Sequence, residues 1–196
     1  NKDYIELLRL HTLLQSIRTN QVLEEVNFIS EKIKKLYCGD DEEKLEMINK
    51  DEVENKINGS YMISLMGSKL DVIDDLGYKL IVNNTKFQLI TSDHPVVFYN
   101  QFLENREYKY AKLGLRSKGL QIFFPISPYL MIHFFDNKVY NLGRKNSNKI
   151  DLTINSVNKL NLLQILNCGE TLFFHPRTQS KYLFGLIQKA NSHRFD

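Results

Sequence analysis

The sequence predicts an α+β protein, with N-terminal helices packed on a mixed or mainly antiparallel β-sheet and further helices at the C-terminus. Apolar residues recur at helical spacing early in the chain, short strand-like runs between turn residues fill the middle, and helical spacing returns at the end. This order favours α+β over a doubly wound sheet. We expect a single domain over 1–196, with a helical part (1–76) and a sheet-containing part (77–196).

Three helices are expected in the helical part. Residues 3–18 place leucine and isoleucine on one face, after Asp3 as the expected N-cap. Residues 22–37 form a second amphipathic pattern and residues 60–76 a third. The acidic segment between these two is predicted to be a short helix or a loop.

The sheet-containing part opens with strand-like runs at 78–84 and 87–92, and a third run at 96–100 follows the break at Pro95. Residues 101–119 are predicted to form a long loop or hairpin. Residues 120–136 contain two apolar strands, and the two prolines between them predict a bulge or an edge crossing. The remaining expected elements are a turn and short strand at 137–143, a helix at 151–168, a strand at 171–176 and a helix at 181–193.

Composition excludes several classes of protein. The 196 residues are 42% hydrophobic, enough for a core, and the net charge of +3 is too small to indicate nucleic-acid binding by itself. Cys38 and Cys168 form no CxxC pair, which argues against a zinc site or a disulfide framework. No apolar run is long enough for a membrane span and no signal peptide is visible, so we expect a cytoplasmic protein without a membrane partner. The abundance of Lys, Asn and Ile is typical of AT-rich bacterial genomes.

Familiar cofactor motifs are absent from the sequence. It contains no GxGxxG, no Walker A motif and no HExxH. A motif-level phosphate cradle is therefore excluded, no metal site is predicted, and the cofactor stays unknown.

The segment Thr91-Ser92-Asp93-His94-Pro95 interrupts apolar residues with polar ones. A strand that ends in this way delivers the Asp93 carboxylate to a sheet edge, where Ser92 or Thr91 could hydrogen-bond it. The carboxylate could then ligate a metal, orient a base or act as a base itself. The alternative is an Asx-turn in which Asp93 caps the backbone two residues on, and the two roles can coexist.

Polar residues elsewhere in the chain are candidates for the same site. Arg18 and Gln15 share a face of an otherwise apolar helix, so Arg18 either pairs with Asp93 or grips a substrate anion. Asn161 lies within a helix and either bonds the backbone of a turn or lines a pocket. Ser127 lacks a nucleophile-elbow context and is expected to be a hydrogen-bonding partner near Asp93.

Basic residues cluster with two tyrosines over 108–119, and Lys112 and Arg116 are among them. Cations interleaved with aromatic side chains on a loop can hold single-stranded nucleic acid, whereas the simpler interpretation is a solvated loop. His133 alternates with apolar residues on a predicted strand and is interpreted as either a packed or an outward-facing side chain.

Four local patterns occur in order: Leu14-Gln15-x-x-Arg18-Thr19, Thr91-Ser92-Asp93-x-Pro95-Val96, Pro125-x-Ser127-Pro128, and Asn161 followed seven residues later by Cys168. Together they resemble the DUF4238 family of bacterial proteins, over about residues 7–174. Two positions depart from the family pattern, since Asn20 replaces a frequent proline and His94 a frequent asparagine. A histidine-containing segment that usually opens the family is expected to be missing before Asn1.

Two functions follow as expectations. The first is a phosphoester or nucleic-acid hydrolase, for which the resemblance implies a bacterial toxin or phage-defence setting. Its site would use Asp93, Arg18, Gln15 and Asn161 for catalysis and Ser92, Ser127, His94, Lys112 and Arg116 for substrate binding. The second is a non-catalytic binding or regulatory module in which the polar residues only clamp helix to sheet.

Overall fold

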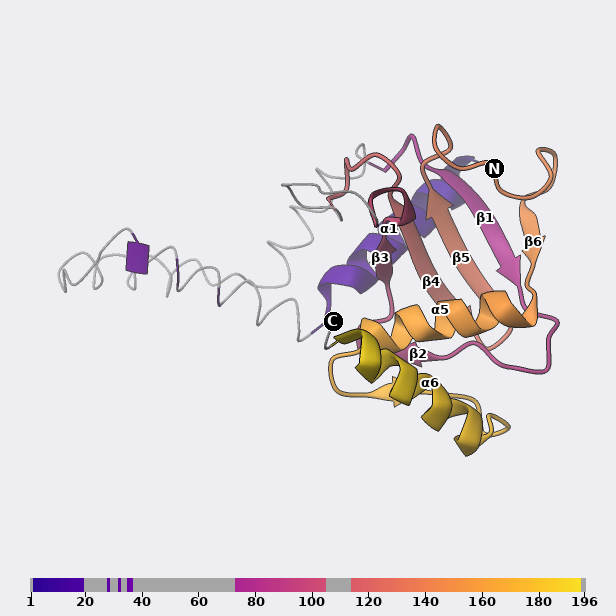
Figure 1. Cartoon of the computed structure of the whole chain (residues 1–196). Helices are drawn as coiled ribbons and strands as arrows, with labels where there is room; N and C mark the ends of the chain where they lie inside the picture. The colour runs from indigo at the N-terminus through magenta and orange to yellow at the C-terminus, as the bar shows by residue number, and fades with distance from the viewer. Residues whose placement is uncertain are drawn as a thin grey trace. The chain divides into compact units, whose positions relative to one another are not determined.

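The computed structural model describes residues 2–19, 28, 32, 35–36, 73–104 and 114–194. The chain divides into two compact units, Asn1–Leu70 and Asp71–Asp196. The first contains helix α1, Lys2–Ile17, and the second contains two sheets and the helices α5 and α6 (Figure 1). The predicted α+β class is confirmed.

Helix α1 confirms the helix predicted over 3–18. It begins at Lys2, so Asp3 is not the N-cap but lies in the first turn, where its negative charge suits the helix dipole. Thr12 Oγ1 donates to the Leu8 carbonyl oxygen over 2.8 Å, which satisfies this hydroxyl within the helix.

Most of the second and third predicted helices, over 22–37 and 60–76, lies outside the described residues, as does the acidic segment between them. Positions 28, 32, 35 and 36 are helical. Next to the sheet, the backbone N–H of Leu76 donates to the Ile73 carbonyl over 3.2 Å and closes a turn. This turn leads directly into the first strand.

The larger sheet has the strand order β3-β4-β5-β1-β6. Its neighbouring strands are antiparallel except β1 and β6, which are parallel, so the predicted mixed sheet is confirmed. The register shifts between Pro125 and Ser127, because proline has no N–H for the ladder, and this confirms the predicted bulge. The strands are β1 (Gly77–Val82), β3 (Val97–Tyr99), β4 (Gln121–Ser127), β5 (Leu130–Phe135) and β6 (Lys149–Asp151).

The strand predicted over 87–92 is shorter than expected. Strand β2 comprises Thr91–Ser92 and pairs with β7, Leu172–Phe173, in a separate two-stranded sheet. Residues 88–90 run beside α5 instead, because a side chain of that helix, Asn161, hydrogen-bonds their backbone. The apolar pattern therefore indicated burial correctly, but the hydrogen-bonding partner is a side chain.

The strand predicted within 137–143 is wrong, and the last strand of the sheet comes later, at β6. Asp136 starts a turn here, since its Oδ1 accepts the N–H of Lys138 over 2.9 Å and its carbonyl oxygen accepts the N–H of Tyr140 over 2.9 Å. Gly143 then adopts a φ of +63°, which favours glycine. Within the loop predicted over 101–119, a 3-10 helix, η2, spans Gln101–Leu103.

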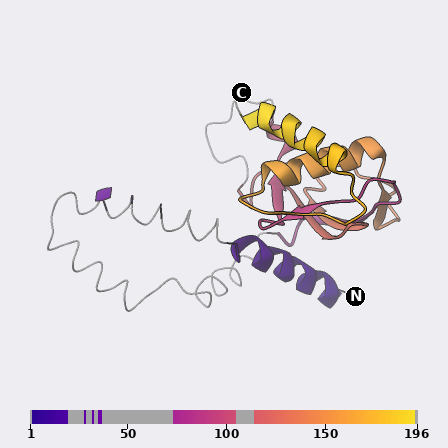
Figure 2. The same cartoon turned by 90° about the horizontal axis from the view of Figure 1, so that it is seen from below.

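Helices α5 (Ile154–Leu166) and α6 (Ser180–Arg194) confirm the last two predicted helices. Thr153 is the N-cap of α5, and its Oγ1 accepts the Ser156 N–H over 3.2 Å. Figures 1 and 2 show α5 lying across the sheet with α6 on its far side. Apolar residues of α5 therefore serve two interfaces: Val157, Leu160 and Leu163 pack towards the sheet, and Leu162, Ile165 and Leu166 towards α6.

Candidate functional site

Asp93 follows strand β2 and its carboxylate is held by backbone groups from a distant turn. Its Oδ2 accepts the N–H groups of Glu170 and Thr171 over 2.7 and 3.2 Å, and its Oδ1 accepts the Gly169 N–H over 3.1 Å. The Cys168 Sγ lies 3.7 Å from Oδ1. Asp93 thus ties the end of β2 to the turn between α5 and β7, rather than capping the backbone two residues on.

These contacts set the protonation of Asp93. Burial raises the pKa of its carboxyl, but the hydrogen bonds from Glu170, Thr171, Gly169 and Cys168 lower it by more, so the net pKa is below the ordinary value. The carboxylate is therefore ionised at neutral pH. With both oxygens accepting hydrogen bonds, it is suited to holding a turn.

Asn161 is 1% exposed and uses both ends of its amide. Its Oδ1 accepts the Ile90 N–H over 3.1 Å, and its Nδ2 donates to the Gln88 carbonyl over 2.8 Å and to the Tyr182 hydroxyl over 3.1 Å. Tyr182 belongs to α6, so this one side chain connects α5, α6 and the segment before β2. The predicted alternative in which Asn161 bonds backbone describes its geometry.

Two further amides of α5 and its C-cap hold the next part of the same segment. Gln164 Nε2 donates to Ser92 Oγ over 2.7 Å and to the His94 carbonyl over 3.0 Å. Asn167 Nδ2 donates to the same His94 carbonyl over 2.8 Å. Ser92 Oγ also accepts the His94 N–H over 3.1 Å. Within the described residues, the buried Gln164 Oε1 has no hydrogen-bond partner.

The sequence reasoning missed this row of amides, although a signal for it existed. Asn158, Asn161, Gln164 and Asn167 recur every three residues, a spacing that keeps each one near the next along a helix. The last three residues of this row bind backbone, and with Asp93 they form a polar clamp, which we define as Asp93, Asn161, Gln164 and Asn167 with the backbone that they bind.

The structure therefore brings together four of the predicted site residues: Ser92, Asp93, His94 and Asn161. Ser127 has a local contact, since its Oγ accepts the Tyr129 N–H over 3.2 Å in the turn between β4 and β5. Its predicted hydrogen bond near Asp93 is not among the contacts of the described residues.

The structure does not test whether the predicted site residues Gln15, Arg18 and Lys112 lie near Asp93. Gln15 and Arg18 belong to the first compact unit, so their convergence with Asp93 stays a prediction. Arg18 follows the end of α1 and is exposed. Lys112 lies outside the described residues.

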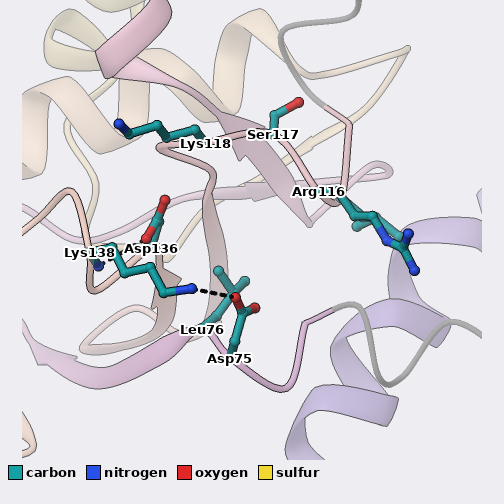
Figure 3. A pocket seen from close by; sticks show the side chains of 8 residues that line it. Asp75, Leu76, Arg116, Ser117, Lys118, Asp136 and Lys138 are labelled. Atoms are coloured by element: carbon teal, nitrogen blue, oxygen red, sulfur yellow. Dashed lines mark hydrogen bonds and ion pairs between the residues drawn. The ribbon is translucent and has the colours of Figure 1, made fainter.

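Arg116 lines a hollow of about 510 Å³ together with Lys118 and Lys138 (Figure 3). The Lys138 Nζ lies 3.6 Å from an Asp75 carboxylate oxygen, and this exposed ion pair is drawn in Figure 3. Asp136 also lines the hollow, and its Oδ2 accepts the Gly119 N–H over 2.9 Å. Three cations and two carboxylates line the hollow, so its side chains carry one net positive charge.

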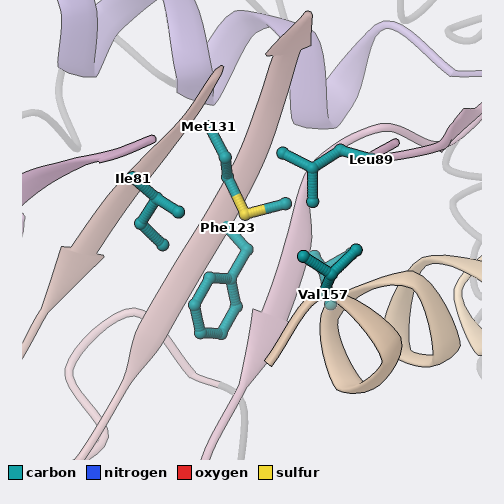
Figure 4. Packing of buried hydrophobic residues seen from close by; sticks show 6 residues of the cluster. Ile81, Leu89, Phe123, Met131 and Val157 are labelled. Atoms are coloured by element: carbon teal, nitrogen blue, oxygen red, sulfur yellow. The ribbon is translucent and has the colours of Figure 1, made fainter. Parts of the chain in front are cut away.

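A second cavity lies between the sheet and α5 and has a volume of about 670 Å³. Ile81, Phe123 and Ile150 line it from the sheet, and leucines of α5 line the opposite wall. The ring of Phe123 projects from the sheet on the side of the α5 residue Val157 (Figure 4). We call this cavity the α5 cleft. Its size and its mainly apolar walls are typical of small-molecule sites.

Two buried polar side chains, His133 of β5 and Gln121 of β4, also line the α5 cleft. They are 4% and 5% exposed, and His133 Nε2 lies 3.1 Å from Gln121 Oε1. The His133 ring stacks on Phe123 with 4.2 Å between ring centres and is tilted against Phe135 at 5.3 Å. Burial lowers the pKa of His133 to about 3, so the ring is neutral at physiological pH.

Each member of this pair has one polar nitrogen left over. Within the described part of the chain, neither His133 Nδ1 nor Gln121 Nε2 makes a hydrogen bond, and neither atom is fully enclosed. The cleft thus has a polar floor with unused hydrogen-bonding capacity. The sequence showed both residues as polar interruptions of apolar strands, but their neighbours gave no motif.

Charged residues of the α5 cleft lie at its rim. Tyr99 Oη donates to Glu104 Oε2 over 2.9 Å in an exposed contact, and Lys159 of α5 is exposed. Burial, and then the neighbouring Glu104, raise the pKa of Tyr99, which keeps its hydroxyl protonated. Across residues 2–19, 73–104 and 114–194, no group of three His, Cys, Asp or Glu side chains could hold a metal ion.

Comparison with known proteins gives one finding. The model of a family described as "Protein of unknown function (DUF4238)" matches residues 1–178. Comparisons with curated proteins and with solved structures gave no match. Among the described helices, none combines the length and apolar character needed to cross a membrane. The family match includes all four motifs of the sequence, and the chain therefore belongs to the DUF4238 family.

Proposed function

We propose that this chain is a non-catalytic binding module whose ligand site is the α5 cleft. One observation carries the proposal: His133 and Gln121, both more than nine-tenths buried, border a cavity of about 670 Å³, and each has a nitrogen that bonds no other described residue. Because neither nitrogen is fully enclosed, water can reach both, and a ligand that bonds them replaces this water at positions that the fold has already fixed. The apolar walls add the contact surface.

The polar clamp supports the same choice between the two expected functions. The Asp93 carboxylate and the Asn161 amide already form hydrogen bonds with backbone groups of the chain. A general base must reach the proton that it removes, whereas these groups are directed at N–H and carbonyl groups of the chain. They therefore suit a clamp between α5 and the segment 88–96.

The hydrolase prediction expects a different result from substitution of Asp93. It requires Asp93→Ala to abolish hydrolysis of a phosphoester, such as bis(4-nitrophenyl) phosphate or single-stranded RNA, while the melting temperature falls by only a few degrees. The binding-module proposal requires the same substitution to lower the melting temperature clearly. The bacterial, cytoplasmic and phage-defence settings expected from the sequence remain part of the proposals, and protection of expressing cells against phage tests the last of them.

The experiment that tests the α5 cleft uses Nile red, an uncharged fluorescent dye whose emission responds to apolar surroundings. We expect one saturable site per chain. Leu142→Trp places a large side chain in the cleft, because Leu142 lines it from the loop after β5, and should weaken dye binding at least tenfold. Ile126→Trp is the matched control, since Ile126 is 48% exposed and lies outside the cleft. Equal dye binding by Leu142→Trp and the native chain would overturn the proposal.

A nucleic-acid partner is a second proposal, and the positive hollow around Arg116 favours it. Phosphate contacts make affinity depend on salt, with a slope that falls by about one for each cation removed. We expect Arg116→Ala/Lys118→Ala to weaken binding of an oligo(dT) strand and to reduce this slope. Lys149→Ala, an exposed lysine on β6 outside the hollow, is the control. Identical salt slopes for all three chains would contradict the proposal.

A further inference from the structure

Building on the proposed binding function, we infer that the α5 cleft takes an uncharged, planar ring compound that carries both an N–H donor and a carbonyl acceptor, as a lactam or a ring amide does. The hydrogen-bonding pattern, the charge and the shape of the cleft each point to this class of ligand.

The hydrogen-bonding pattern comes from the pair His133 and Gln121. With the amide oriented as in the structure, Gln121 Oε1 accepts from His133 Nε2–H, because this oxygen cannot donate. Nδ1 of the ring is then an acceptor, and Nε2 of the amide is a donor. If the amide were reversed, its nitrogen would donate to the ring, and the pair would present a ring N–H and an amide oxygen instead. Either orientation offers the ligand one donor and one acceptor.

The charge at the floor excludes an ionised ligand head. Burial holds the His133 ring neutral, and Gln121, Phe123 and Phe135 around it carry no charge. Lys79 pairs with His133 in register across β1 and β5, but its ammonium donates to the carbonyl groups of Arg144 and Ser147. A buried carboxylate would therefore be without a cation at the floor and would lose its hydration, whereas an amide loses far less.

The shape of the cleft favours a flat ring. The aromatic ring of Phe123 faces the side of α5 (Figure 4). Leucines of that helix, such as Leu160 and Leu163, form the opposing wall. Aromatic ligands gain stacking energy on such a ring beyond the area that they bury. The charged side chains Glu104 and Lys159 stay at the rim, where a polar substituent of the ligand can remain hydrated.

Three matched compounds test this inference on the full chain. Quinolin-2(1H)-one has a ring N–H beside a carbonyl, its N-methyl derivative keeps the carbonyl and loses the donor, and 2-naphthoate is a charged ring of similar size. We expect quinolinone to bind with saturation in ligand-observed NMR. The N-methyl derivative should bind about tenfold more weakly, the loss of one hydrogen bond to a buried group. Naphthoate should show no saturable binding over the same concentrations.

Two further measurements locate the contact. Quinolinone, but not its N-methyl derivative, should shift the ¹⁵N resonance of His133 Nδ1. In His133→Phe the preference for quinolinone over the N-methyl compound should disappear, while binding of the ring remains. Equal affinity of the native chain for both quinolinones, or tighter binding of naphthoate, would overturn the inference. If Nile red still binds at the cleft in that case, the binding module stands and only the ligand class fails; if the dye does not bind there, the proposed function fails as well.

Discussion

The polar clamp joins α5 to the segment 88–96, and the α5 cleft lies between the same helix and the larger sheet, yet the polar groups of the two regions are used differently. Asp93 has both oxygens bonded to backbone, and Asn161 has both ends of its amide bonded. His133 and Gln121 bond each other and keep one nitrogen each without a partner in the described part of the chain. Buried polar residues that saturate each other hold the fold together, whereas those with capacity left over beside a cavity are suited to a ligand.

Among the substitutions that separate the two regions, Asn161→Ala should have the largest effect on stability. It removes three hydrogen bonds and leaves the Ile90 N–H and the Gln88 carbonyl without partners in a buried place. We expect a loss of about 3 kcal/mol in the free energy of unfolding, measured by urea denaturation. Asn158→Ala is the matched control on the same helix, because its described contact is one hydrogen bond from the Tyr182 hydroxyl, and should cost about 1 kcal/mol. If the two variants are equally stable, Asn161 is not a clamp.

Asp93→Asn should have the next largest effect. The substitution keeps the shape but replaces charge-assisted hydrogen bonds from Gly169, Glu170 and Thr171 with weaker ones, and it turns an NH₂ group towards backbone donors. We expect a loss of about 2 kcal/mol in the free energy of unfolding. Asp151→Asn, in which an exposed carboxylate loses its charge, should leave it nearly unchanged. Native stability in Asp93→Asn would return Asp93 to the list of candidate catalytic groups.

Much of the fold followed from the apolar pattern, because α5 and α6 place apolar residues at helical spacing and the β4–β5 hairpin consists of two apolar runs buried on both faces. The segment 87–92 shows the limit of that reasoning. Its apolar residues indicate burial, and burial beside a strand and burial beside the Asn161 amide give the same sequence pattern. Which group supplies the hydrogen bonds is decided by tertiary structure.

The candidate sites were predictable to different degrees. Asp93 stood out because a carboxylate interrupts an apolar run, but its partners are backbone N–H groups more than 75 residues away, and backbone groups have no sequence signature. The α5 cleft was missed because a cavity is a space between elements. His133 on its own resembles any packed strand histidine until its neighbours are known.

The two regions should also respond to pH in different windows. Unfolded His133 takes up a proton below about pH 6.5, whereas burial lowers its pKa in the folded state to about 3. Between these values the unfolded state binds more protons, so stability falls as the pH falls, by at most about 1.4 kcal/mol per pH unit. The folded pKa of Asp93 is below its ordinary value of 3.8, so its contribution is lost only at lower pH.

Urea denaturation at pH 7.5, 6.5, 5.5 and 4.5 separates these contributions. His133→Phe should flatten the dependence of the free energy of unfolding on pH between 6.5 and 4.5. Asp93→Asn should follow the native curve in parallel over the same range, because both states of the native chain keep Asp93 ionised there. A native slope in His133→Phe would show that the His133 ring is protonated in the folded protein.

The smallest effect on stability is expected from replacing both floor residues. Either Gln121→Leu or His133→Phe leaves one buried polar group without its partner and should cost about 1 kcal/mol. The double variant replaces the pair with apolar groups that suit the walls of the cleft, so its unfolding free energy should return to within about 0.5 kcal/mol of the native value. A double-mutant cycle measures this coupling. If instead the losses in unfolding free energy of the two single variants add up in the double variant, the pair stabilises the fold as Asn161 does. The pair would then not be evidence for a ligand site.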